Sequence, residues 1–86
     1  MKATEAIARI AQLNSPGDIL YFKDKMTGSR ISIAKQYGDY VIWFYNISAV
    51  LFVDVIMMGP LPNELILFTR DNESGRLGIK DWEVDE

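Results

Sequence analysis

Residues 41–58 read VIWFYNISAVLFVDVIMM, and fifteen of these eighteen residues are apolar. The polar exceptions are Asn46, Ser48 and Asp54. A membrane-spanning helix needs about 20 apolar residues, so this block is barely long enough, and an acid near its centre would cost about 2.5–3.5 kcal/mol. Its many β-branched and aromatic residues favour strands instead. We therefore predict two strands, over 40–46 and 49–57, and keep membrane association through 41–58 as a less favoured alternative.

Both faces of these two predicted strands are apolar. In the first strand, one face would carry Tyr40, Ile42 and Phe44, and the other Val41, Trp43 and Tyr45. In the second strand, one face would carry Ala49, Leu51, Val53, Val55 and Met57, and the other Val50, Phe52, Asp54, Ile56 and Met58. An antiparallel sheet with one wet side should alternate cleanly between apolar and polar residues. The predicted sheet is therefore covered on both sides, either entirely by the chain's own core or partly by a protein partner.

The rest of the chain predicts one helix and further strands. Apolar residues recur at spacings of three and four over 3–13, which is the pattern of an amphipathic helix, and Pro16 prevents its continuation. Branched and aromatic runs between turn residues predict the remaining strands, over 18–24, 29–36, 64–70 and 76–84. The predicted fold class is α+β, with an N-terminal helix followed by a five- or six-stranded antiparallel meander or a small SH3-like barrel.

The composition excludes several classes of function. The chain has 86 residues and a net charge of −3, and it contains neither cysteine nor histidine. The commonest nucleophiles, general bases and zinc ligands are therefore missing. A chain of this length forms one domain, residues 1–86, which is hardly large enough for both a core and a deep substrate cleft. We expect a protein that is not an enzyme and that uses no cofactor and no metal.

Charge is unevenly distributed along the chain. Residues 1–35 carry six basic and three acidic residues, whereas residues 36–86 carry three basic and nine acidic ones. Nucleic-acid binding depends on lysine and arginine meeting phosphates, so the overall acidic balance weighs against it. One hairpin nevertheless combines aromatic rings with basic side chains, as grooves for single-stranded nucleic acids do. This alternative nucleic-acid site consists of Tyr21, Phe22, Lys23, Lys25 and Arg30.

Aromatic residues predict a protein interface. Trp, Tyr, Phe and Met are enriched where proteins contact one another, and one short helix covers only part of a sheet face. The predicted protein-binding residues are Trp43, Tyr45, Tyr40 and Trp82. The leading prediction is a non-catalytic protein-binding module, a small adaptor or inhibitor that acts by surface occupancy. Its partner is an unidentified protein or a second copy of the chain.

Three further features have ordinary explanations. Asp54 interrupts an apolar run, and we expect it at a bulge or strand end rather than as a functional acid. Trp82 lies among four acids of the last six residues, and we expect it to anchor this segment by packing. Residues 1–17 contain no long apolar core, so no secretory signal is predicted and the expected location is cytoplasmic.

Overall fold

The N-terminal helix is shorter than the sequence pattern predicts. In the computed structural model, which describes residues 1–85, helix α1 spans Ala3–Ile10 rather than 3–13. The N–H of Gln12 donates to the carbonyl of Arg9, and that of Leu13 to the carbonyl of Ile10. These bonds reach back three residues instead of four, so the last turn tightens and the α-helix ends. Leu13 is still buried with the apolar face of α1.

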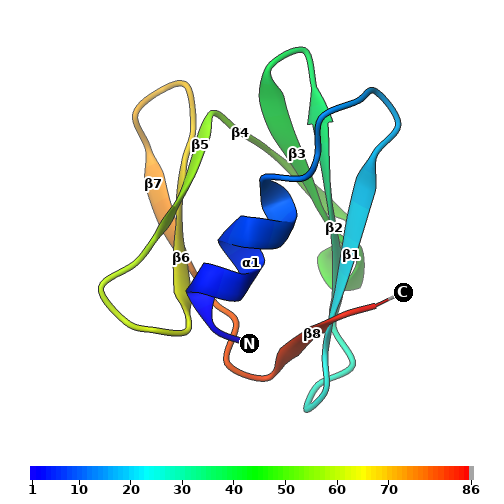
Figure 1. Ribbon diagram of the computed structural model, residues 1–86, viewed down its shortest axis with the longest axis vertical. Coiled ribbons are helices and arrows are strands. Elements are labelled where there is room, and N and C mark those ends of the chain that lie inside the picture. The colour runs from blue at the N-terminus through cyan, green and yellow to red at the C-terminus, as the bar shows by residue number, and fades with distance from the viewer. Residues whose placement is uncertain (86) are drawn as a thin grey trace.

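The strands form two antiparallel sheets, which confirms the predicted α+β class. One sheet has five strands in the order β4-β3-β2-β1-β8, and the other has three in the order β5-β6-β7. The five-stranded sheet comprises β1 (Ile19–Asp24), β2 (Arg30–Gln36), β3 (Asp39–Phe44), β4 (Ala49–Val53) and β8 (Trp82–Val84). The three-stranded sheet comprises β5 (Val55–Met58), β6 (Glu64–Phe68) and β7 (Ser74–Gly78). The sheets face each other, and α1 lies across the opening between them (Figure 1).

Six strands were predicted and the described residues form eight, because two predicted strands divide where the chain changes sheets. The predicted strand 49–57 bends at Asp54, whose N–H donates to the Phe68 carbonyl at 2.8 Å. The predicted strand 76–84 is interrupted between β7 and β8, where the N–H of Ile79 donates to the Asn63 carbonyl. Each sheet change therefore takes place within one nearly continuous stretch of chain, as at a barrel corner. The expectation that Asp54 marks a bulge or strand end is confirmed.

The bend also shifts which side chains face inward. Val53 is fully buried, but Val55 is exposed and Ile56 packs against the core instead. The prediction that Val55 and Met57 share a face with Leu51 was wrong, because one additional residue at the corner reverses the alternation that follows.

A short turn ends β3 earlier than predicted. Residues Tyr45–Ile47 form the 3-10 helix η1, and Ser48 adopts a left-handed conformation with φ of 51°. The chain therefore turns directly from β3 into β4. The less favoured alternative of a membrane-spanning helix over 41–58 was wrong, because these residues form strands and this turn. No helix within residues 1–85 has the length and apolar character needed to cross a membrane.

The core fills the space between the two sheets and the helix. It contains Ala3, Ala6, Ile10, Leu13, Phe22, Ile31, Ile33, Ile42, Val53, Leu65, Leu67, Ile79 and Trp82. Every strand of the five-stranded sheet has one face turned toward this core, and α1 covers the side where β5 is an edge strand. In the part of the chain that the structure describes, the opposite face of the five-stranded sheet is largely uncovered, and η1 contacts β2 there. This largely uncovered face is the feature that function must explain.

A candidate protein-binding face

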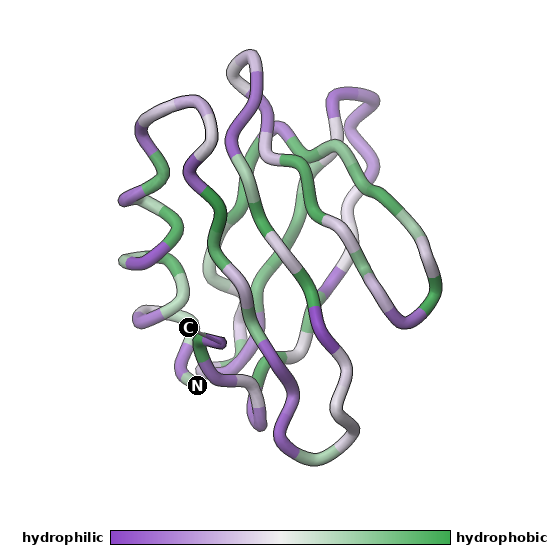
Figure 2. The backbone as a smooth tube through the Cα atoms, turned by 90° about the vertical axis from the view of Figure 1, so that its right-hand side faces the viewer, coloured by the Kyte–Doolittle hydropathy of each residue, from purple (hydrophilic) through white to green (hydrophobic). Residues whose placement is uncertain are grey.

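Two cross-strand rows of uncharged residues cover the outside of the five-stranded sheet. One row consists of Ile19, Ala34, Val41 and Phe52, on β1, β2, β3 and β4 respectively. The other row consists of Tyr21, Ser32, Trp43 and Val50 on the same strands. We call these eight residues, together with Tyr45, the outer face. Figure 2 looks onto it, and the middle parts of the strands there are largely hydrophobic.

The outer face leaves large apolar side chains in contact with water. Phe52 is 61% exposed, Ile19 48% and Trp43 46%. Apolar residues scattered singly over a surface are normal, but Trp43 and Phe52 lie diagonally on the adjacent strands β3 and β4, and Ile19 belongs to the same cross-strand row as Phe52. Contiguous apolar patches of several hundred Å² on soluble proteins mark places where another molecule binds. The outer face is therefore the strongest candidate site among the described residues.

The outer face is hollowed along its middle. A groove of about 470 Å³ runs over β2, whose outward residues are small or polar, and the larger side chains of β1, β3 and β4 form its sides. The Trp43 and Tyr45 rings stack with centroids 6.1 Å apart and an angle of 26° between their planes. The Tyr45 hydroxyl donates to Ser32 Oγ at 3.2 Å, which holds the ring over Ser32. These contacts fix the aromatic side of the groove in place, so little conformational entropy is lost on binding.

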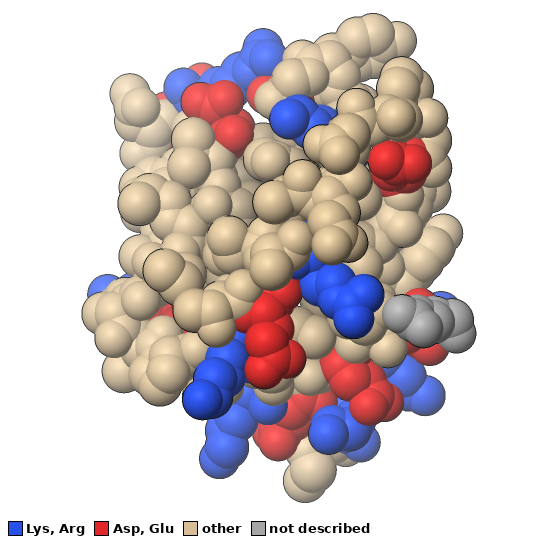
Figure 3. Space-filling view, in the orientation of Figure 1, with Lys and Arg blue, Asp and Glu red and all other residues tan. Residues whose placement is uncertain are grey.

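Charged residues lie at one end of the outer face. There, Lys23 is the cross-strand neighbour of Glu83, and the Arg30 guanidinium lies 2.7 Å from the Asp85 carboxylate. The lower end of Figure 3 likewise shows basic and acidic side chains intermixed. A surface that tracks phosphates needs an excess of positive charge, and here each of these basic side chains has an acidic neighbour.

The predicted protein-binding residues divide into two groups. Trp43 and Tyr45 come together on the outer face. Tyr40 lies on the inner side of β3, half-buried against the core, with the Lys35 ammonium 5.5 Å from its ring centroid. The prediction that Trp82 contacts a partner was wrong, because β8 pairs with β1 and turns this ring into the core, where it is only 9% exposed. The expectation that Trp82 anchors the C-terminal segment by packing is confirmed, although Glu86 lies outside the described residues.

The predicted nucleic-acid site is divided between the two faces of its hairpin. Tyr21 points outward, but Phe22 is buried in the core, because successive residues of a strand point to opposite faces. Its proposed role as a base-stacking ring was wrong. Lys23 and Arg30 lie on the outer side, and Lys25 lies in the turn after β1, where its N–H donates to the Asp81 carbonyl.

Sequence reasoning named only Tyr21, Trp43 and Tyr45 of the outer face as site residues. It missed the exposed apolar side chains of Ile19, Val50 and Phe52. The alternation within 49–53 placed Val50 and Phe52 on a common face, but it did not show that this face is exposed. Which face the helix and the second sheet cover is decided by tertiary packing, and no local pattern reveals it.

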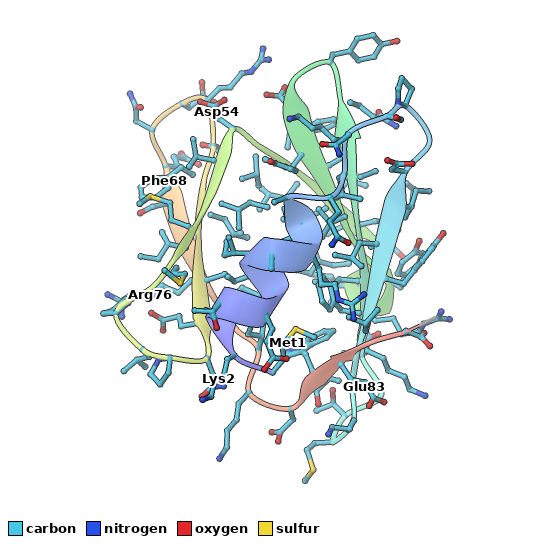
Figure 4. All side chains as sticks on the ribbon, viewed as in Figure 1. Met1, Lys2, Asp54, Phe68, Arg76 and Glu83 are labelled. Atoms are coloured by element: carbon cyan, nitrogen blue, oxygen red, sulfur yellow. The ribbon has the colours of Figure 1, made fainter. Side chains whose placement is uncertain are left out.

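The outer side of the three-stranded sheet is a weaker candidate. It presents Val55 and Met57 beside the half-buried Ile66 and Phe68, with Arg76 directly across from Ile66. Figure 4 shows Phe68 and Arg76 on the side of this sheet that is turned away from α1. A charged side chain within the patch makes it less suited to an apolar partner, so it serves below as a source of control substitutions.

The outer face has the chemistry of a contact surface. Its polar side-chain groups are the hydroxyls of Ser32, Tyr21 and Tyr45 and the indole N–H of Trp43, and the Tyr45 hydroxyl donates a hydrogen bond to Ser32. Within residues 1–85, no group of three or more acidic side chains is arranged to hold a metal ion. Comparison with protein-family models, with curated proteins and with solved structures finds no match to this chain. The geometry of the outer face is therefore the feature that points to a function.

Proposed function

We propose that this protein is a non-catalytic protein-binding module that acts by occupying a partner's surface through its outer face. The observation that carries the proposal is the pair of uncharged cross-strand rows, in which Trp43 is 46% exposed and Phe52 61%. Aromatic side chains in a preformed hollow are the usual anchors of protein interfaces, because they bury a large area at little entropic cost.

The proposed mode of action is steric. When a partner binds the outer face, the partner's own contact surface is blocked for other molecules, as expected for a small adaptor or inhibitor. Specificity comes from the groove over β2 and from the charged residues at one end of the face, since rim charges orient a partner and like charges reject a wrong one.

The test is capture of a partner from native lysate by the tagged protein, before and after nuclease treatment. Trp43→Ala is compared with Met57→Ala, which removes a side chain of nearly equal exposure from the other sheet. We expect a stoichiometric protein that survives nuclease, is retained by Met57→Ala and is lost with Trp43→Ala. Circular dichroism of each variant verifies that the fold survives.

Two results would contradict the proposal. Capture that disappears with nuclease would move the function to the basic hairpin containing Lys23, Lys25 and Arg30, and its affinity should then fall steeply with salt. Capture that is unaffected by Trp43→Ala would place the interface on another surface.

A further inference from the structure

Tyr37 has a backbone conformation that disfavours its own side chain. The chain passes from β2 to β3 through a two-residue turn whose φ angles are both positive, 51° at Tyr37 and 86° at Gly38. Such a turn favours asparagine followed by glycine, and a bulky residue at its first position crowds the backbone. The other non-glycine residues with positive φ within residues 1–85, Ser48 and Asn72, have small polar side chains. Tyr37 is therefore the conformational outlier of the fold.

The Tyr37 side chain does not stabilise the fold. It is 100% exposed, more than any other large hydrophobic side chain in the described part of the chain. Its hydroxyl forms no hydrogen bond with the residues that the structure describes. Folding alone would favour a different residue at this position, because nothing in the protein offsets the strain. Strain of this kind is typical of residues that contact another molecule.

The hairpin beneath Tyr37 holds the ring in a fixed place. Strands β2 and β3 pair at six successive positions, and the last pair, Gln36 with Asp39, adjoins the turn. The Asp39 carboxylate is bound by Arg70 from the turn after β6, which ties the hairpin to the other sheet. Figure 1 shows the β2–β3 turn at the upper end of the molecule. Little conformational entropy of the turn is therefore lost when the ring is bound.

The tip of the hairpin carries no charge. Residues 36–38 are uncharged, and the charged residues on either side have partners within the chain. The Lys35 ammonium lies 5.5 Å from the Tyr40 ring centroid, and the Asp39 carboxylate is paired with Arg70. A ring that enters an apolar environment from this tip therefore takes no unpaired charge with it.

The outer face alone is small for a protein interface. An aromatic side chain buries roughly 150–250 Å², and a standard interface needs about 800 Å² per partner. The exposed fractions of Tyr21, Trp43, Tyr45 and Phe52 run from 36% to 61%, so these four offer on the order of 400 Å². The fully exposed ring of Tyr37 would add roughly 150–250 Å². A partner that covers the outer face therefore gains substantially by reaching the tip.

We propose that Tyr37 is an anchor that enters a pocket of the protein partner. This inference rests on the proposed function and specifies which part of the partner is occupied. The pocket has apolar walls that take the ring and a hydrogen-bonding group at its end that pairs with the hydroxyl. The tip adjoins the outer face, because Gln36 lines both the groove over β2 and a hollow of about 370 Å³ beside Tyr37. One partner can thus take the ring in a cleft and cover the outer face with the rim of that cleft.

Tyr37→Asn tests the strain and the anchor together. It converts the turn to Asn-Gly, so the midpoint of thermal unfolding should rise by about 4 °C or more. The affinity for the protein captured from native lysate, measured by calorimetric titration, should nevertheless fall at least ~10-fold, because the anchor is gone. A tyrosine that only supported the fold would lower the midpoint when replaced.

Two variants serve as controls. Tyr37→Phe keeps both the ring and the strain, so it should leave the midpoint unchanged and weaken binding less than Tyr37→Asn does. Met26→Ala removes a side chain that is 76% exposed in the turn between β1 and β2, and it should leave binding unchanged. Nitration with tetranitromethane gives a readout without substitution. Tyr37 should react readily in the free protein and be protected in the complex.

The outcomes separate this inference from the proposed function. A partner that is lost with Trp43→Ala but binds Tyr37→Asn at full affinity, or leaves Tyr37 open to nitration, overturns the inference while the proposed function stands. A midpoint that does not rise with Tyr37→Asn also overturns it, because the strain is then absent. Binding that is lost with Tyr37→Asn but not with Trp43→Ala supports the anchor and contradicts the role of the outer face. If the chain captures no protein, both fail.

Discussion

The Arg70 guanidinium forms a bidentate ion pair with the Asp39 carboxylate. Nε donates to Oδ1 at 3.0 Å, and a second guanidinium nitrogen lies 2.9 Å from Oδ2. Arg70 belongs to the turn after β6 and Asp39 begins β3, so this pair joins the two sheets at the ends of two inner strands. The Asp39 side chain is only 16% exposed, whereas Arg70 is largely in solvent.

We predict that Arg70→Ala destabilises the protein more than Asp39→Asn does. Removing the arginine leaves a carboxylate that is largely shielded from water without its partner, whereas Asp39→Asn removes the charge as well. An exposed pair contributes about 0.2–1 kcal/mol, and this one should lie at the upper end because it is bidentate. A double-mutant cycle by urea unfolding at low and high salt measures the coupling, which should shrink as salt rises. Equal losses for the two single variants would contradict this account.

The two tryptophans should differ sharply when replaced by alanine. Trp82→Ala empties a core position and should lower the free energy of unfolding by about 3–5 kcal/mol. Trp43→Ala removes a half-exposed ring and should cost about 1 kcal/mol. Chemical denaturation followed by circular dichroism gives both values. Comparable losses would place Trp43 in the core and remove the basis of the outer face.

Gly59 is required because Glu64 fills the space that a side chain would need. An added Cβ at Gly59 would lie 2.6 Å from Glu64 Oε1 and 3.0 Å from its Cγ. We predict that Gly59→Ala costs about 1–3 kcal/mol and that Glu64→Ala relieves part of this loss. Gly75→Ala, which meets no atom within 4 Å, should cost nothing and serves as the control. Thermal unfolding of the single and double variants decides, and additive effects would rule out the close approach.

Asp54 should matter through its backbone rather than its carboxylate. Its side chain is exposed, whereas its N–H donates to the Phe68 carbonyl at the corner between the sheets. Asp54→Asn should change stability by less than about 0.5 kcal/mol. Asp54→Pro should cost about 3 kcal/mol or more, because it removes this donor. Urea midpoints of the two variants distinguish the roles, and a large loss for the asparagine variant would restore a function for the carboxylate.

Local patterns predicted the helix, the strands and the faces of β3 because each of these depends on neighbouring residues. The spacing of apolar residues placed Trp43 and Ile42 on opposite sides correctly. The pattern failed after Asp54, because the strand changes sheets there and the residue at the corner interrupts the alternation of side chains. The assignment of Trp82 to a partner contact failed as well, because β8 closes onto β1 from 58 residues away in the chain.

The candidate site could be predicted only in part, because local sequence patterns do not show which residues the neighbouring strands bring together. Trp43 and Tyr45 carry a compositional signal that local reasoning can use. Ile19 contributes only through its register with Ala34 on the neighbouring strand, which is a property of the assembled sheet. Tyr40 and Phe22 are aromatic like Trp43 and Tyr45. Only the side of the strand to which each side chain points distinguishes these core residues from those of the outer face.

The two stretches of chain that run through both sheets have a mechanical consequence. Since β4 continues into β5 and β7 leads directly to β8, neither sheet can open without pulling on strands of the other. Partial melting that releases one layer alone is therefore strongly disfavoured. Amide hydrogens in the three-stranded sheet should exchange with solvent by the same whole-molecule opening as those of β2, even though that sheet is the smaller of the two.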